Sequence, residues 1–305
     1  MVSRKLIIFI VCFIQVCFAD AKVWPGPEVW PPQTVSWNLN DGKVLTIIAT
    51  HHTNNLDSPV NKCVKEAFTS DKPDIYVMEG FCGEREGVSP QRLQEKSKIC
   101  EEENQCGENL YAAHLATINN IKFIGMELSE KAQIPLLKTH GYSRDDVIFY
   151  LLVQQLPFFY RDGDFKTHTQ KFTPQTWESM CNNFLQETIA GWIEDDVTLT
   201  YQDFLQWWKK RFGAPLDMEK EFSVWERGVL YHEPSLDKDA LYTQKIAYWF
   251  HKNRDDHIFK VIETAVKENT KTLVVFGSNH LRALWDKLNV AYGKPTSQKQ
   301  LPSAT

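Results

Sequence analysis

Two hydrophobic runs, one near each end of the chain, lead through small residues into a histidine. Val44–Thr50 is followed by His51 and His52, and Thr272–Asn279 is followed by His280. Short apolar runs that end in turn residues are typical of strands buried in a parallel sheet. Ligands of such sheets bind in the crevice outside the carboxyl ends of the strands. We therefore expect histidines from opposite ends of the chain to face one pocket.

Two further apolar runs end in a glutamate. Asp74–Met78 leads into Glu79, and Ile121–Met126 leads into Glu127, with helical patterns between the runs. Alternating strands and helices build a parallel sheet, because each crossover returns the chain to the same edge. The sequence thus predicts an α/β fold with a mostly parallel central sheet flanked by helices.

The chain is divided into segments of different character. Residues 22–290 are expected to form a single α/β domain. Within it, residues from about 129 to 238 show helical patterns and no convincing buried strand, so we expect a helical insert there. The polar residues 291–305 have too few apolar side chains to pack and are expected to form a disordered tail.

The first 21 residues have the pattern of a signal peptide. Arg4 and Lys5 precede the apolar run Leu6–Phe18, and Ala19-Asp20-Ala21 is a small-residue cleavage site. The apolar run is shorter than the ~20 residues that a membrane-spanning helix needs, so we expect cleavage and a secreted or periplasmic protein. An uncleaved N-terminal anchor is the alternative. No later stretch of the sequence is suited to a stable membrane span.

The charge of the chain argues against nucleic acid as a partner. Lys and Arg number 34 against 39 Asp and Glu, and no block of basic residues stands out. Binding to nucleic acid needs clustered basic side chains that neutralise phosphates. Nucleic acid is therefore not expected as a partner, and a peptide or small-molecule substrate is expected from the motifs described below.

Five cysteines follow the signal peptide, and an exported chain meets an oxidising compartment. Cys82, Cys100 and Cys106 lie close together in a polar stretch, whereas Cys63 and Cys181 stand apart. We predict one disulfide among the first three, with the pairing left open. An odd number leaves at least one thiol free or paired between chains. A zinc site is disfavoured, because no C-x-x-C motif occurs.

The polar strand ends indicate acid-base or metal chemistry. Imidazole and carboxylate groups that converge, here His52, Glu79 and His280, can bind a divalent metal or share a proton in catalysis. Arg254 lies on a long helix before the last strand, where it can pair with a strand-end carboxylate or neutralise a substrate oxygen. Structural explanations compete with these roles. The glutamates suit a turn or a helix start, His280 suits a helix cap, and Arg254 next to Asp255 suits a solvated pair.

Taken in order, these motifs resemble those of the TraB/Tiki/GumN superfamily, which includes erythromycin-esterase-like and ChaN-like proteins. The family has two G-x-x-H motifs. Gly277-Ser278-Asn279-His280 matches the second, and Ala49-Thr50-His51-His52 matches the first, except that Ala49 replaces the glycine. Tyr76-Val77-Met78-Glu79 resembles the family's glutamate strand. Asn253-Arg254-Asp255, followed by His257, resembles its arginine-containing helix. The resemblance covers about residues 44–128 and 240–288.

The resemblance implies a sheet built from two related βαβ halves with the site between them. Its members include metal-dependent peptidases, esterases, haem-binding lipoproteins and pheromone-control proteins. We expect first a hydrolase that cleaves a peptide or ester bond. In a metal-dependent version, His52, Glu79 and His280 hold Zn, Mn or Co, and a bound water attacks the carbonyl. In a metal-free version, His52 activates the water directly, and Glu79 fixes its tautomer.

Further residues are expected to assist this site. Glu127 or a nearby carboxylate would accept the proton, and Arg254 would stabilise the oxyanion. His51 and His257 are possible accessory residues, since one neighbours His52 and the other follows Arg254 on the same helix.

Two other functions stay open. A haem- or metal-binding protein of ChaN type is suggested by the aromatic residues of the insert, although such residues more often form a packed core. These residues are Phe158, Phe159, Tyr160, Trp207 and Trp208. A non-catalytic regulatory or interaction protein on the same fold is suggested by Ala49, which departs from the family motif.

Overall fold

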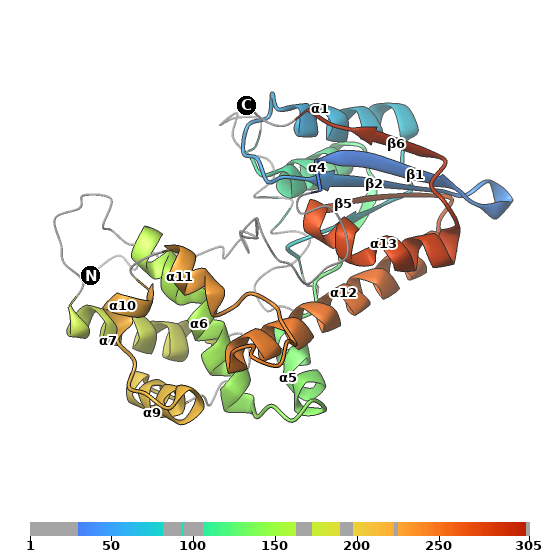
Figure 1. Ribbon diagram of the computed structural model, residues 1–305. Helices are drawn as coiled ribbons and strands as arrows, with labels where there is room; N and C mark the ends of the chain where they lie inside the picture. The colour runs from blue at the N-terminus through green and yellow to red at the C-terminus, as the bar shows by residue number, and fades with distance from the viewer. Residues whose placement is uncertain are drawn as a thin grey trace.

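A sheet of six strands, in the order β4-β3-β5-β2-β1-β6, forms the centre of the protein in this computed structural model (Figure 1). The structure describes residues 30–81, 93, 95, 100, 106–162, 173–189, 198–222 and 225–302. The predicted signal peptide and Cys82 lie outside these residues.

Four neighbouring strands of the sheet are parallel, which confirms the predicted fold class. β5 pairs in parallel with β2 and with β3, and β3 pairs in parallel with β4. Their carboxyl ends therefore lie at one edge of the sheet. Their bounds are β2 Val44–Thr50, β3 Ile75–Met78, β4 Lys122–Gly125 and β5 Lys271–Gly277.

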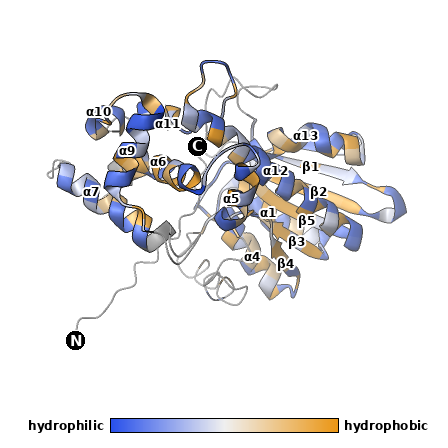
Figure 2. Cartoon of the chain, turned by 90° about the horizontal axis from the view of Figure 1, so that it is seen from below, coloured by the Kyte–Doolittle hydropathy of each residue, from blue (hydrophilic) through white to orange (hydrophobic). Residues whose placement is uncertain are grey.

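Two strands were not predicted, and one of them corrects the expectation of a disordered tail at 291–305. β1 (Gln33–Asn38) is joined to β2 by the short helix η1 (Asn40–Gly42) and pairs with it antiparallel. β6 (Ser297–Gln300) pairs antiparallel with the other side of β1. All four β6 residues are exposed, so the strand forms through main-chain pairing and not through apolar burial. Figure 2 shows β1 paler than the apolar β2 beside it. A hydrophobic pattern cannot reveal such polar edge strands.

Helices cover both faces of the sheet (Figures 1 and 2). Because side chains alternate along a strand, each parallel strand contributes to both cores. One core lies under α1, η2 and α4, and the other lies under α12 and α13. These elements are α1 Pro59–Glu66, η2 Ala67–Asp71, α4 Glu108–Ile118, α12 Tyr242–Glu268 and α13 Ser278–Tyr292.

Between residues 129 and 238, the described part of the chain forms helices joined by turns and loops and contains no strand. These helices form a third core that includes Trp207 and Trp208, with Phe159 packed against it. These aromatics therefore stabilise the insert. Its elements are α5 Glu130–Lys138, α6 Arg144–Asp162, α7 Pro174–Asn183, η4 Phe184–Ile189, α9 Tyr201–Phe212, α10 Met218–Phe222 and α11 Trp225–Leu230.

Within the described ranges, no helix has both the length and the apolar character to cross a membrane. Trp30 and Trp37 pack on the sheet domain. The Trp30 and Trp37 rings lie 5.0 Å and 6.2 Å from the ring of Trp285 in α13, and Trp37 Nε1 donates to the Gly293 carbonyl. This contact fixes the connection between α13 and β6.

Gly125 ends β4 at a point where another segment crosses it. A Cβ atom at Gly125 would lie 2.0 Å from the carbonyl oxygen of Phe81, and that oxygen also accepts a hydrogen bond from the Glu127 amide. The loop after β3 therefore packs directly on the backbone of β4. This close approach sets the positions of the polar residues after both strands.

We expect Gly125→Ala to lower the free energy of unfolding by about 2 to 3 kcal/mol, because the added methyl group forces the two backbones apart. Gly107→Ala is the matched control, since the nearest atom to its Cβ would lie 3.7 Å away. Urea unfolding of both variants measures the difference. An equal loss in the two variants would contradict the packing argument.

Candidate functional site

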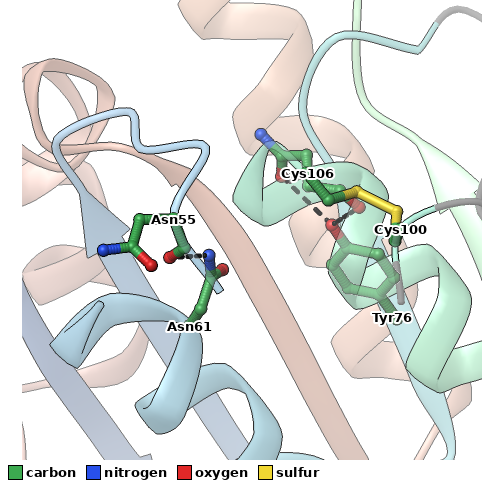
Figure 3. The surroundings of a disulfide bond; sticks show 6 residues. Asn55, Asn61, Tyr76, Cys100 and Cys106 are labelled. Carbon is green, nitrogen blue, oxygen red and sulfur yellow. Dashed lines mark hydrogen bonds between the residues drawn. A yellow bond between two sulfur atoms is a disulfide. The ribbon is translucent and has the colours of Figure 1, made fainter. Parts of the chain in front are cut away.

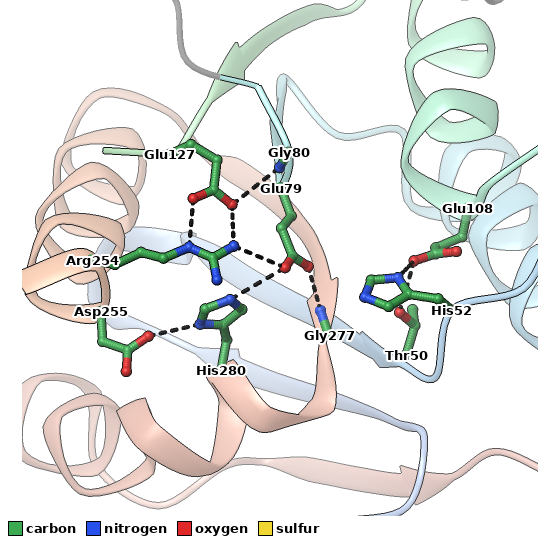
Figure 4. A network of polar contacts seen from close by, with 10 residues as sticks. All are labelled: Thr50, His52, Glu79, Gly80, Glu108, Glu127, Arg254, Asp255, Gly277 and His280. Atoms are coloured by element: carbon green, nitrogen blue, oxygen red, sulfur yellow. Dashed lines mark hydrogen bonds and ion pairs between the residues drawn. The ribbon is translucent and has the colours of Figure 1, made fainter. Parts of the chain in front are cut away.

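The polar residues that follow the four parallel strands gather at one edge of the sheet, as predicted (Figure 4). His52 follows β2, Glu79 follows β3, Glu127 follows β4, and His280 lies in the first turn of α13 after β5. Since β5 lies between β2 and β3, residues from opposite ends of the chain become neighbours.

Glu79 is buried and uses both carboxylate oxygens. Its Oε2 accepts a hydrogen bond of 2.6 Å from the Gly277 amide, and its Oε1 lies 3.2 Å from both Arg254 Nη2 and His280 Nε2. Burial alone would raise the pKa of Glu79. The charges of His280 and Arg254 outweigh that effect and hold the pKa well below its ordinary value. Glu79 is therefore a buried carboxylate anion.

Arg254 is buried on α12 and bridges two strand-end carboxylates. Its guanidinium donates to both oxygens of Glu127, with Nε to Oε2 at 2.6 Å, and to Glu79. Glu127 also accepts from the Gly80 amide. Arg254 thus forms the predicted pair with strand-end carboxylates, and the competing interpretation as a solvated helix pair is wrong.

His280 is held between two carboxylates. Its Nδ1 lies 2.7 Å from Asp255 Oδ1, and its Nε2 faces Glu79. Burial and the neighbouring Arg254 would lower the pKa of His280, but the two carboxylates outweigh them and raise it to about 9. Both ring nitrogens then donate, so the buried His280 is an imidazolium at neutral pH.

His52 has a carboxylate partner that the sequence did not indicate. Its Nδ1 lies 2.6 Å from Oε1 of the buried Glu108, which also accepts from the Thr50 hydroxyl and the Thr53 amide. Our expectation that Glu79 fixes the tautomer of His52 is therefore wrong, because Glu108 is the residue that fixes it. Since a carboxylate oxygen accepts in this contact, Nδ1 carries the proton and Nε2 carries the lone pair of the neutral ring.

The second nitrogen of His52 is open. The side chain is 31% exposed, and Nε2 has no hydrogen-bond partner among the described residues. Figure 4 shows the ring beside the contact between Glu79 and Gly277. Burial would lower the pKa of His52, but hydrogen bonding to Glu108 and the charges of Glu108 and Glu79 raise it above 6.5. Of the two histidines of this edge, His52 is therefore the partly exposed one and His280 the buried one.

The two possible accessory histidines take no part in the contacts described above. His51 Nε2 lies 3.0 Å from the Trp30 carbonyl, which turns this ring towards the N-terminal segment. Of the two histidines after β2, His52 is therefore the one at the site. His257 is partly exposed on α12, and the contacts described above form without it.

The three predicted metal ligands do not fit a metal ion as they are arranged. Within the part of the chain that the structure describes, no three His, Cys, Asp or Glu side chains are placed to hold one. The oxygens of Glu79 are engaged by Gly277, Arg254 and His280. A divalent cation on Glu79 would also lie next to two positive charges.

Sequence reasoning missed Glu108 and Asp255. Both lie on helices, where an acidic residue is ordinarily explained by the helix dipole or by a nearby base. Glu108 is only 2% exposed and Asp255 only 8% exposed, and their contacts identify them as the partners of His52 and His280. An acid that directly follows Gly107 at a helix start was the only signal for Glu108.

Comparison with known proteins adds no identification. No family model, no curated protein and no solved structure matches this chain. The resemblance to the TraB/Tiki/GumN superfamily therefore stays a prediction from the short motifs, and the geometry carries the functional argument.

We expect the stability of the folded protein to fall as pH rises from 6.5 through about 9. The folded state raises the pKa of His280 above its ordinary value, so the proton stabilises the folded chain and is lost over that range. In His280→Gln this alkaline loss, on the order of 3 kcal/mol, should be absent. Urea unfolding across this pH range measures it. The same pH dependence in both proteins would contradict the assignment of an imidazolium.

Proposed function

We propose that this protein is a hydrolase in which His52 activates a water molecule for attack on the carbonyl of a peptide or ester. The proposal rests on one observation: His52 Nδ1 is paired with the buried Glu108, while Nε2 has no hydrogen-bond partner among the described residues and the side chain is 31% exposed. A fixed tautomer with an accessible lone pair is what a general base requires.

The reaction balances on these residues alone. As a water oxygen attacks the carbonyl carbon, one of its protons passes to His52 Nε2, and Glu108 and Glu79 stabilise the imidazolium that forms. The tetrahedral intermediate then collapses, the bond to the leaving amine or alcohol breaks, and His52 returns the proton to it. A pKa that the carboxylates raise above 6.5 suits a group that must take and return a proton near neutral pH.

The edge of the sheet also offers a group that can stabilise the negative charge that develops on the carbonyl oxygen of the substrate. α13 begins at Ser278, directly after β5, and its first amides have no acceptor within the helix. The positive end of its dipole favours an oxyanion there. Arg254 is bound to Glu127 and Glu79, so we assign it the role of a positioning residue that holds Glu79 beside His280.

A metal-dependent version is the second candidate, because one observation favours it. Both histidines have Nδ1 fixed by a carboxylate, His52 by Glu108 and His280 by Asp255. This is the outer arrangement typical of metal-binding histidines. The mutual contacts of Glu79, Arg254 and His280 count against it, and no step above uses a metal.

The location we propose is secreted or periplasmic. The N-terminal 21 residues have the composition of a signal peptide, and a disulfide joins Cys100 to Cys106. A disulfide persists in oxidising compartments, which supports export.

We expect His52→Ala to lower kcat by about 100-fold or more on whichever substrate a panel of chromogenic esters and fluorogenic peptides identifies, because general-base catalysis is lost. In Glu108→Gln the pKa of His52 should fall, since a negative charge is removed, and the acidic limb of the pH profile should move to lower pH. His51→Ala is the matched control and should keep full activity. Full activity in His52→Ala would refute the proposal.

Dialysis against EDTA distinguishes the two versions of the reaction. We expect activity to survive chelation, because the oxygens of Glu79 and both nitrogens of His280 are already engaged. Loss of activity that Zn, Mn or Co restores would favour the metal-dependent version and would contradict the metal-free one.

A further inference from the structure

The start of α4 carries Glu108 but has no side-chain cap. Its N-cap residue is Gly107, which has no side chain to accept from the first amides of the helix. The Glu108 carboxylate is turned instead to His52, Thr50 and Thr53. A helix end without a cap frays readily, so other contacts must hold Glu108 in place.

The segment just before Glu108 is anchored at two points. The Cys106 amide donates to the Asn54 carbonyl at 2.9 Å, in the loop that follows His52. The buried Asn61 of α1 fixes that loop by donating to the Asn55 carbonyl (Figure 3). Cys106 is also bonded covalently to Cys100.

The disulfide itself is buried in the core beneath the sheet. Cys100 and Cys106 are 0% and 5% exposed, and they pack in the same core as Tyr76 of β3 (Figure 3). The Tyr76 hydroxyl donates to Asn109, one residue after Glu108. The first turn of α4 is thus tied to the core on both sides of Glu108.

We propose that the disulfide between Cys100 and Cys106 is a positioning device that keeps Glu108 on His52, so that the base functions fully only when the two cysteines are oxidised. This inference rests on the proposed function of His52. Of the three cysteines that the sequence grouped, the structure pairs the two nearest to Glu108. When the bond is absent, the uncapped helix start loosens and Glu108 leaves His52. Burial then dominates the pKa of His52 and lowers it, and the tautomer is no longer fixed.

The test compares Cys100→Ser/Cys106→Ser with the wild-type chain, and Cys63→Ser is the control because Cys63 is a free cysteine of α1. NMR titration of ring-labelled histidine, with the His52 signal assigned from its absence in His52→Ala, gives the pKa of His52 without any substrate. We expect this pKa to fall in the double variant and kcat to fall about tenfold or more at little change in KM. The control should match the wild type.

The acidic limb of the pH profile should move in the same direction as in Glu108→Gln, which a purely structural role of the disulfide would not cause. Should the double variant not fold, the same titration is made on wild-type protein treated with a phosphine reductant. Alkylation and mass spectrometry then verify that both thiols are free.

An unchanged pKa of His52 in folded protein without the disulfide would overturn the inference, whatever happens to activity. Failure of the proposed function is a separate result, because it appears as activity that survives His52→Ala.

Discussion

The whole edge of the sheet depends on the contacts that the carboxylate of Glu79 makes. It follows β3, accepts from the Gly277 amide at the end of β5, and pairs with Arg254 of α12 and His280 of α13. A buried charge is costly unless it is fully paired, so four segments must meet at one place for the fold to form. The same requirement brings chemistry-bearing residues from both ends of the chain together.

This edge combines a closed network with one open group. Arg254, Glu127, Asp255 and His280 satisfy one another and Glu79, and they set the shape and charge of the site. His52 stands at its border with a partly exposed side chain and a buried partner of its own. The proposed hydrolase activity rests on this combination of a rigid, charged support and a neighbouring histidine that can exchange a proton.

The apolar runs of the sequence predicted β2, β3, β4 and β5 and the residues that follow them. A strand of a parallel sheet is buried on both faces and therefore consists almost entirely of apolar residues. Arg254 was predicted as a partner of those residues. β1 and β6 were missed because pairing in the main chain leaves no hydrophobic pattern. Glu108 was missed because its burial comes from packing of α4 against the loop after β2, and Asp255 because its partner lies on another helix. Tertiary contacts alone distinguish these acids from solvated ones.

α12 passes through two cores. Its first turns contribute Ile246 and Phe250 to the core of the insert, its later turns contribute Ile258 and Ile262 to the core of the sheet, and Arg254 lies between them. Because α12 is one continuous helix that belongs to both cores, no boundary separates the insert from the sheet at which one of them could unfold while the other stays folded. The insert and the sheet are therefore coupled in unfolding. A tilt of the insert is transmitted along α12 to the charged residues at the middle of this helix.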